Sequence, residues 1–484
     1  MNAQRIARLV VWFFLLLPVT AGAQAVNATI AGVVRDASGG VMPGVTVEAT
    51  SPALIEKARS VVTDGQGLYR IVDLRPGTYI VVFTLPGFNT FRREGLELTT
   101  GFTANVNAEL RVGALEESIT VTGEAPVVDI QNIREQTTIR RDMLDALPTT
   151  RRLAQLATLI PAATTGGATF VDVGGVGSDR GQIATHGQRP NDMSWNVGGI
   201  DSRVFTGGNF MFNVHTFQEL VVETLAGSAE TSTGGVQLNV VPKDGGNRFS
   251  GTFSTEHTGP GLQNDNIDDK LRARGLTVGP ASSSVRKYYD TGGGFGGPIR
   301  QNKLWFFAAH RWLVKSQYQQ GNYWNKRQGT LFYEPDLDRP AYIEDTYKDT
   351  SVRLTWQAAA KHKITFSHSQ QPACQCFFGL LESATGGGAL LTPEATAATY
   401  YNPGYMPMAT WTFPATNRLL IEASGSANGY FRNPKRQPGV DGDDIAVTDV
   451  GKNLSYGSRA TAITTGYNTL VRMVVHQRAA VSYV

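Results

Sequence analysis

The second half of the chain, from residue 247 onward, contains stretches in which apolar and polar side chains alternate at every position. Between residues 350 and 357, Val352, Leu354 and Trp356 alternate with polar residues, and segments 247–256 and 418–431 repeat the pattern. A period of two is typical of strands with one apolar face. The connections are short at 298–302, 358–360 and 415–417, and long at 257–289, 315–349, 370–407 and 432–468. Short turns at one rim and long loops at the other predict an outer-membrane β-barrel, closed on itself because lipid cannot hydrogen-bond a free strand edge.

The N-terminus carries the pattern of an export signal. Arg5 and Arg8 precede an apolar run over residues 9–17, and the small residues Ala21-Gly22-Ala23 precede Gln24. This order predicts a secretory signal peptide over residues 1–23, with an uncleaved signal-anchor as the alternative. The mean hydropathy is −0.18 and no later segment has a long apolar run, which excludes helical membrane spans. We therefore expect an exported, β-rich chain.

The only two cysteines, Cys374 and Cys376, lie in a predicted outer loop. Residues that are two apart on an extended chain point the same way, so a disulfide between them would be strained. A loop disulfide in an oxidising compartment remains open, and a metal site with so few ligands is the weaker alternative.

Residues 24–112 contain about seven short strand patterns separated by turn signals, which predicts a β-sandwich. Three stretches carry a resemblance: IAGVVRD at 30–36, TDGQGLY at 63–69 and LRPGTY at 74–79. They resemble the carboxypeptidase regulatory-like domain. The resemblance implies a transthyretin-like sandwich and no peptidase chemistry. Carbohydrate binding is often proposed for that family, but no matched binding residue is present here.

Residues 113–126 read as a linker that contains one strand-like segment. This segment alternates, is rich in β-branched residues and ends at Gly123 and Pro126. From the pattern alone it is either a strand of a neighbouring domain or a strand offered to the sheet edge of a partner. The segment resembles the TonB box, which implies that TonB is contacted by Glu117, Ser118, Ile119, Thr120, Val121 and Thr122.

Residues 127–243 resemble the plug domain of TonB-dependent receptors, in particular the Oar-like group with a regulatory-like domain in front. Two short helical patterns are expected within 139–163, and the marks of the resemblance are GQRP at 187–190, GID at 199–201 and GGVQLNVV at 234–241. Gly198 and Pro242 depart from the family pattern, which usually has an acidic residue and a Thr there. Two further segments, 294–299 and 303–307, match the early barrel of the same group.

The resulting prediction is a mainly β chain: a sandwich, an α+β plug, and part of a transmembrane barrel over residues 244–484. About eight strands are expected there, whereas plugged transporters have roughly 22, so we expect the N-terminal portion of a longer protein. An eight-stranded barrel is the alternative, but its lumen could not house a plug. The resemblance implies an outer-membrane TonB-dependent receptor or transporter, with lipid and TonB as partners and the regulatory-like domain in the periplasm. The ligand is unidentified, with an oligosaccharide or a peptide as candidates.

Two other functional classes stay open at this stage. One is an Oar-like structural or adhesive outer-membrane protein without energised uptake, and the other is a secreted sugar-binding module. Enzymes are disfavoured because the seven histidines show no zinc spacing, no Gly-x-Ser-x-Gly segment occurs, and the glycine run at 292–297 precedes Pro298 and a strand. We expect no catalytic residue, no cofactor, no metal and no nucleic-acid partner.

The long segment 315–349 is the predicted recognition surface because it is rich in aromatic residues, which suit flat ligands or sugar faces. Tyr318, Tyr323 and Trp324 are the candidate ligand-binding residues. An aromatic girdle at the membrane rim, or packing of one loop on another, is the alternative.

Overall fold

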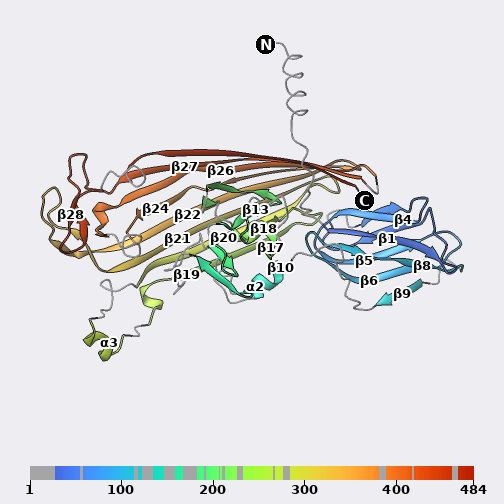
Figure 1. Cartoon of the computed structure of the whole chain (residues 1–484), viewed down its shortest axis with the longest axis horizontal. Coiled ribbons are helices and arrows are strands. Elements are labelled where there is room, and N and C mark those ends of the chain that lie inside the picture. The colour runs from blue at the N-terminus through green and yellow to red at the C-terminus, as the bar shows by residue number, and fades with distance from the viewer. Residues whose placement is uncertain are drawn as a thin grey trace, which may run out of the picture.

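The structure is a computed structural model in which the chain forms a sandwich, a plug sheet and a curved barrel-wall sheet (Figure 1). It describes residues 28–54, 58–113, 118–122, 135–146, 159–166, 182–189, 192–205, 208–209, 213–225, 233–264, 267–275, 284–380, 389–416, 419–459 and 467–483. The predicted signal peptide lies outside these residues.

Two sheets form the sandwich, and both follow the predicted strand pattern. One has the order β3-β2-β5-β6-β9, and in the other β1 pairs with β4, β7 and β8. Their bounds are β1 Ala28–Asp36, β2 Thr46–Thr50, β3 Ala58–Val62, β4 Leu68–Leu74, β5 Gly77–Thr84, β6 Thr90–Leu98, β7 Thr103–Asn105, β8 Ala108–Leu110 and β9 Ser118–Thr122.

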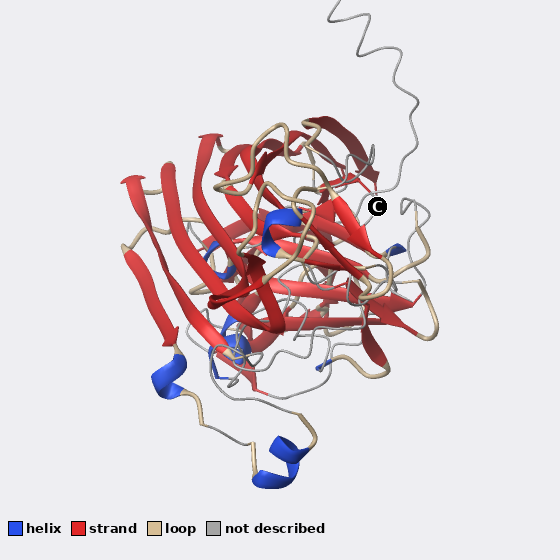
Figure 2. Cartoon of the chain, turned by 90° about the vertical axis from the view of Figure 1, so that its left-hand side faces the viewer, coloured by secondary structure: helices blue, strands red, loops and turns tan. Residues whose placement is uncertain are grey.

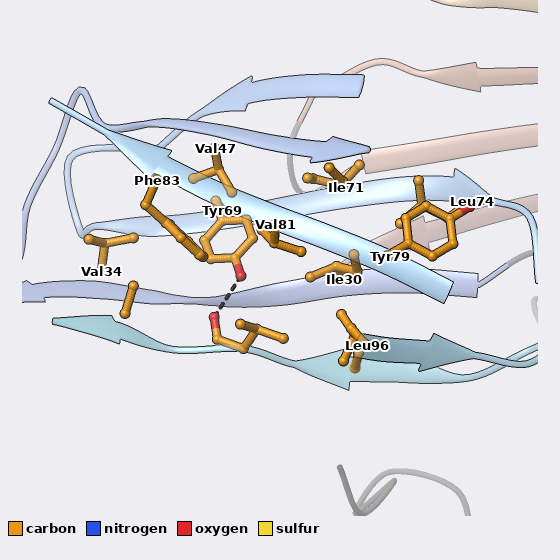
Figure 3. Packing of buried hydrophobic residues seen from close by; sticks show 14 of the residues in the cluster. Ile30, Val34, Val47, Tyr69, Ile71, Leu74, Tyr79, Val81, Phe83 and Leu96 are labelled. Atoms are coloured by element: carbon orange, nitrogen blue, oxygen red, sulfur yellow. Dashed lines mark hydrogen bonds between the residues drawn. The ribbon is translucent and has the colours of Figure 1, made fainter. Parts of the chain in front are cut away.

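Alternate residues of each strand point into the core between the two sheets (Figure 3). Ile30, Tyr79 and Phe83 are fully buried there, and Tyr69 packs edge-on against Phe83 with ring centroids 5.4 Å apart. The Tyr69 hydroxyl donates a 2.6 Å hydrogen bond to the carbonyl of Val106. This bond satisfies a polar group that burial would otherwise penalise.

The plug is built on a second sheet with the order β10-β17-β18-β13-β14. The bounds are β10 Glu135–Arg140, α2 Arg141–Ala146, β11 Ala163–Gly166, β12 Gln182–Thr185, β13 Ser194–Val197, β14 Ile200–Asp201, β15 Arg203–Phe205, β16 Gly208–Asn209, η3 Val214–Thr216, β17 Phe217–Leu225 and β18 Gln237–Pro242. The first of the two helical patterns expected within 139–163 is confirmed as α2, which begins at Arg141, whereas Ile139 at the start of that segment is a buried residue of β10. The second pattern lies largely outside the described residues.

The barrel wall is a nine-stranded antiparallel sheet with the order β19-β20-β21-β22-β23-β26-β27-β30, in which β24 also pairs with β22 and β26. Figure 2, viewed from the end that carries the long loops, shows these strands curving around one side of the molecule. The bounds are β19 Ser250–Thr258, η4 Pro260–Leu262, α3 Asp269–Ala273, β20 Val285–Arg300, β21 Leu304–Asn325, β22 Pro335–Ala359, β23 His362–Gln370, β24 Ala373–Phe378, β25 Leu390–Leu391, η6 Pro393–Ala395, β26 Ala397–Pro414, β27 Leu419–Arg436, β28 Val447–Asp449, β29 Leu454–Tyr456 and β30 Leu470–Tyr483.

The short turns were predicted at the right places, but two of the long loops are largely strand. Segment 315–349 was expected to be a loop, yet β21 runs to Asn325 and β22 begins at Pro335. Segment 370–407 contains β24 and more than half of β26. These strands extend beyond the region in which one face is apolar, so the alternation that marks a strand in sequence is lost there.

The apolar face of the barrel-wall sheet points away from the plug and is exposed. Phe253 is 74% exposed and Trp356 is 44% exposed, and many further apolar residues of the outer face are exposed, such as Phe249, Phe295, Phe366, Met473 and Tyr483. A contiguous exposed surface of this kind marks a partner or a membrane. Among the described residues no helix is long and apolar enough to cross a bilayer.

Aromatic residues lie at two levels of this outer face. Near the short turns, Phe413 stacks on His362 at 4.4 Å and on Trp411 at 5.8 Å between centroids. Toward the long loops, Trp312 packs against Tyr289 at 5.3 Å. On β22 the two levels lie at separate positions, because Trp312 is opposite Lys348 and His362 is opposite Ala359.

Candidate functional site

The predicted partner-binding segment forms β9, the last strand of one sandwich sheet. It pairs in parallel with β6, from Ser118 opposite Thr90 to Thr122 opposite Glu94. This is the first of the two arrangements that the sequence left open, a strand of the neighbouring domain. Glu117 lies outside the described residues. Within the part of the chain that the structure describes, the other edge of β9 pairs with no strand.

One carboxylate joins the plug, the sandwich and the barrel wall. Asp244 follows β18 on the connection to the wall, and one of its oxygens accepts from Arg75 of the sandwich. The other oxygen accepts from Arg353 Nε and, at 2.8 Å, from the Thr355 hydroxyl, both on β22. Burial alone would raise the pKa of Asp244, but Arg353, Arg75 and Lys363 together outweigh it and hold the pKa well below its ordinary value. The group therefore stays ionised.

A second contact between the sandwich and the wall lies beside the first. Lys363 of β23 reaches Asp73 of β4 at 3.1 Å, and Arg59 of the sandwich lies 3.4 Å from the same carboxylate. Lys363 is two residues after the short turn between β22 and β23. The sandwich is thus docked at the short-turn rim of the wall, which agrees with its place in Figure 1. We name Asp73, Arg75, Asp244, Arg353 and Lys363 the junction cluster.

The plug meets the wall through a second buried carboxylate, Asp349 of β22. Its oxygens accept from Asn213 of the plug at 2.9 Å and from three neighbours on the wall, the Ser351 hydroxyl at 2.6 Å, the Ser369 hydroxyl at 2.7 Å and Gln371 at 2.8 Å. Four donors satisfy a charge that would otherwise be costly to bury. The contact between plug and wall is therefore polar at Asp349, whereas Val197 and Ile200 of the plug meet two methionines of β26 in a small apolar cluster.

The plug and the sandwich share a buried contact of their own. Glu219 of β17 is 1% exposed and accepts hydrogen bonds from the backbone N–H and the hydroxyl of Thr100. Burial raises the pKa of Glu219 to about 7, although the Thr100 N–H and Arg140 act in the opposite direction. This carboxyl therefore titrates near neutral pH.

Two cavities lie along the inner side of the wall. The small cavity has a volume of about 70 Å³ and lies between plug and wall, lined by residues that include Asn213, Asp349 and Ser367. The large cavity, about 920 Å³, lies among sandwich, plug and wall, and its lining includes Ile80, Gln218, Asp244, Arg248, Lys363 and Thr410. Pro242 and Arg353 line both cavities and so form the boundary between them.

The three candidate ligand-binding aromatic residues lie at the far end of β21 and are partly buried. Trp324 packs edge-on against Phe377 at 6.2 Å and lies under the guanidinium of Arg339 at 4.5 Å. The carbonyl of Tyr323 accepts from the Tyr333 hydroxyl at 3.1 Å, and Tyr318 pairs with Tyr342 on β22. Trp324 of β21 thus packs against a side chain of another strand, β24.

The long loops form one assembly. β25, from the connection between β24 and β26, pairs with β29, from the connection between β27 and β30, and β28 completes a three-stranded sheet. Gln328 of the β21–β22 hairpin donates to Asp444 at 2.8 Å and to the Gly457 carbonyl at 2.7 Å. Three connections that are far apart in sequence therefore support one another.

Cys374 and Cys376 form a disulfide within β24. This confirms the loop disulfide that the sequence left open, on a strand and not in a loop. Among the residues that the structure describes, no group of three or more histidine, cysteine or acidic side chains is placed to hold a metal ion.

Sequence reasoning missed the junction cluster and Asp349. Asp244 contacts residues 169 and 109 positions away, so no local spacing indicates the pairs. The available signal was the polar side of the alternating strands, on which Arg353 and Ser351 lie.

Taken together, the sandwich, the plug sheet and the curved wall with an apolar outer face resemble the parts of an outer-membrane TonB-dependent receptor with a regulatory-like domain in front. Residues 29–111 match the family model of the carboxypeptidase regulatory-like domain. The chain is similar to the TonB-dependent transporter Oar of Myxococcus xanthus, with 30% identity over 295 residues that cover 58% of this chain and 26% of the relative. The chain thus spans about a quarter of the length of that relative.

The solved structures to which the chain is similar include a receptor and a transporter. The siderophore receptor PirA of Acinetobacter baumannii has 14% identity and a TM-score of 0.43, covering 71% of this chain and 44% of that chain. The outer membrane transporter YddB of Escherichia coli has 11% identity and a TM-score of 0.46, covering 72% of this chain and 45% of that chain. None of these relatives is named as an enzyme.

Proposed function

We propose that this chain is part of an outer-membrane TonB-dependent transporter that takes up a small ligand. The observation that carries the proposal is the plug sheet held by polar contacts, through Asn213 and Asp349, against a wall whose outer face is apolar. Such a plug can separate from the wall because water can replace the contacts. The resemblance to Oar supports energised uptake over a purely structural or adhesive role.

The proposed orientation places the sandwich in the periplasm. Transmembrane β-barrels of this kind have short turns on the periplasmic side and longer loops outside. Contacts of Asp73 and Arg75 dock the sandwich at the short-turn rim. The assembly of long loops then faces the exterior, where Tyr318, Tyr323 and Trp324 remain the candidate ligand-binding residues.

The proposed partner of β9 is periplasmic TonB, which would add a strand to the sheet β3-β2-β5-β6-β9. β-Augmentation needs an edge with free N–H and C=O groups, and β9 is the end strand of that sheet. The proposed contact residues are Glu117, Ser118, Ile119, Thr120, Val121 and Thr122.

The experiment that tests the function is uptake by cells in which Val121→Pro replaces the natural protein. Proline removes a backbone donor and resists strand pairing, so we expect uptake to fall to the level of cells without TonB. The matched control is Val121→Ala, which keeps the N–H and should retain most of the uptake. Normal uptake by Val121→Pro cells with normal outer-membrane levels of the protein would refute the proposed function.

A further inference from the structure

The two cavities and the junction cluster lie in one place, where all three parts of the molecule meet. Pro242 and Arg353 separate the small cavity from the large one, and Asp244 lies two residues after Pro242 and is bonded to Arg353. The contacts that hold Asp244 in place therefore also hold Pro242 and Arg353, the boundary between the two cavities.

The sandwich binds one of the two carboxylate oxygens of Asp244, and the wall binds the other. One carboxylate oxygen is held by Arg353 and Thr355 of the wall, and the other is held by Arg75 from the turn after β4. Asp73, at the end of the same strand, binds Lys363 on the wall. The sandwich is thus attached on both sides of this turn.

The ion pairs of the junction cluster are strong because they are shielded. The side chains of Asp73, Asp244, Arg353 and Lys363 are 4%, 10%, 15% and 16% exposed. Charge pairs withdrawn from water are screened little by salt and are costly to leave half-made. Breaking the pairs on the sandwich side would leave Asp244 with the wall alone.

The chain is constrained on both sides of Asp244. Gly245 follows it and lies so close to the wall that an added Cβ would be 2.2 Å from the Phe306 carbonyl oxygen, whereas Gly246 has no such close contact. Pro242, at the end of β18, precedes it. Lys243 N–H donates to the Thr216 carbonyl of the plug at 2.7 Å, so Asp244 lies where the chain passes from the plug to the wall.

We propose that the sandwich is a latch on the plug: through Asp73 and Arg75 it keeps Asp244 in place and so keeps the two cavities separate. When the sandwich is pulled away, the boundary at Pro242 and Arg353 opens and the cavities join into a passage along the wall toward the periplasm. This inference rests on the proposed function and adds a regulatory role for the sandwich. On the side of the plug and the wall, the lining of the large cavity includes Arg248, Arg353 and Lys363 beside Asp244, so it would favour an anionic solute once the sandwich is pulled away.

The test measures access to the small cavity in the purified full natural protein, without TonB. Ser367→Cys places a reporter thiol in the small cavity, and Thr78→Cys places one in the large cavity. The native cysteines are joined in a disulfide and do not react. The rate of labelling with a charged, water-soluble maleimide is then compared with and without Arg75→Gln plus Lys363→Gln.

We expect labelling of Ser367→Cys to accelerate about tenfold in the double variant, with the Thr78→Cys rate unchanged. The matched control is Arg92→Gln, which removes a sandwich charge that pairs with Glu94, far from the junction cluster. An acceleration smaller than threefold, in protein with native circular dichroism, overturns the proposal. If the double variant does not fold, the labelling rate is measured with Lys363→Gln alone, and an acceleration smaller than threefold again overturns the proposal.

The two proposals fail separately. Val121→Pro tests uptake in cells that have TonB, whereas labelling requires no TonB. Normal uptake in Val121→Pro cells refutes the transporter and leaves the labelling result standing, and an unchanged labelling rate refutes the latch and leaves the transporter standing.

Discussion

The sandwich is held together by an apolar core, whereas the plug–wall junction combines a small apolar cluster with buried polar contacts. In the sandwich, Ile30, Tyr79 and Phe83 are completely buried between two sheets. At the junction, Asp244 and Asp349 collect hydrogen bonds and ion pairs from several elements. Apolar burial is lost as a whole when a core opens, whereas polar contacts can be exchanged for water one at a time. The comparison teaches that the sandwich can move as a rigid unit while the junction can separate.

The largest effect is expected from Phe83→Ala. Truncating this fully buried ring leaves a cavity, and such changes cost about 3–5 kcal/mol of unfolding free energy. Calorimetry should show the transition of the sandwich at a lower temperature, with the barrel-wall transition unchanged. The control is Val62→Ala on the edge strand β3, where the side chain is 51% exposed and the cost should stay within about 0.5 kcal/mol. Equal losses of unfolding free energy in Phe83→Ala and Val62→Ala would contradict the view that the buried core holds the sandwich together.

A pH dependence of similar size is expected at the contact between Glu219 and Thr100. The ordinary pKa of Glu219 is 4.5, and burial raises it to about 7 in the folded protein. The folded state therefore holds a proton that the unfolded state loses first, so stability is full below pH 4.5 and is lost as pH rises through 7. The loss is on the order of 3 kcal/mol.

Glu219→Gln is the variant that isolates this dependence, because the amide keeps the shape and an acceptor oxygen without titrating. Thermal unfolding measured from pH 4.5 to pH 8 should be markedly less pH-dependent in the variant than in the natural protein. If both proteins show the same pH profile, Glu219 is not the group responsible.

The smallest effect is expected from Asp349→Asn at the plug–wall junction. The amide cannot accept from all four donors, so plug docking should weaken by about 2 kcal/mol. Hydrogen exchange should rise in β17 and β18, with exchange in β20–β22 unchanged. The control is Ser367→Ala, two residues before Ser369 on β23 and not among the four donors to Asp349. If the backbone amides of β20–β22 also exchange faster, the contacts of Asp349 stabilise the wall itself and not only the docking of the plug.

The sequence predicted those parts in which one apolar face repeats every second residue. Val352, Leu354 and Trp356 placed part of β22, and TDGQGLY placed the turn before β4. The pattern ended near Lys315 because β21 and β22 continue beyond the outward apolar band, where either face can be polar. The partner of β9 was not predictable, because an alternating strand fits any open edge.

The sequence predicted the part of the candidate site that is formed by consecutive residues. The strand Ser118–Thr122 was found from its own residues, whereas Asp244 and Asp349 act through partners that only the folded topology brings together. Trp324 was found as an aromatic residue, but its contacts with Phe377 and Arg339 depend on the packing of distant connections.

The parallel pairing of β9 with β6 makes the response to mechanical load depend on direction. Interstrand hydrogen bonds run across the strands, so tension along β9 strains all of them together, while tension across β9 ruptures them in succession. Force applied along β9 would thus move the whole sandwich before the strand detaches. Force applied across β9 would detach the strand and leave the sandwich in place.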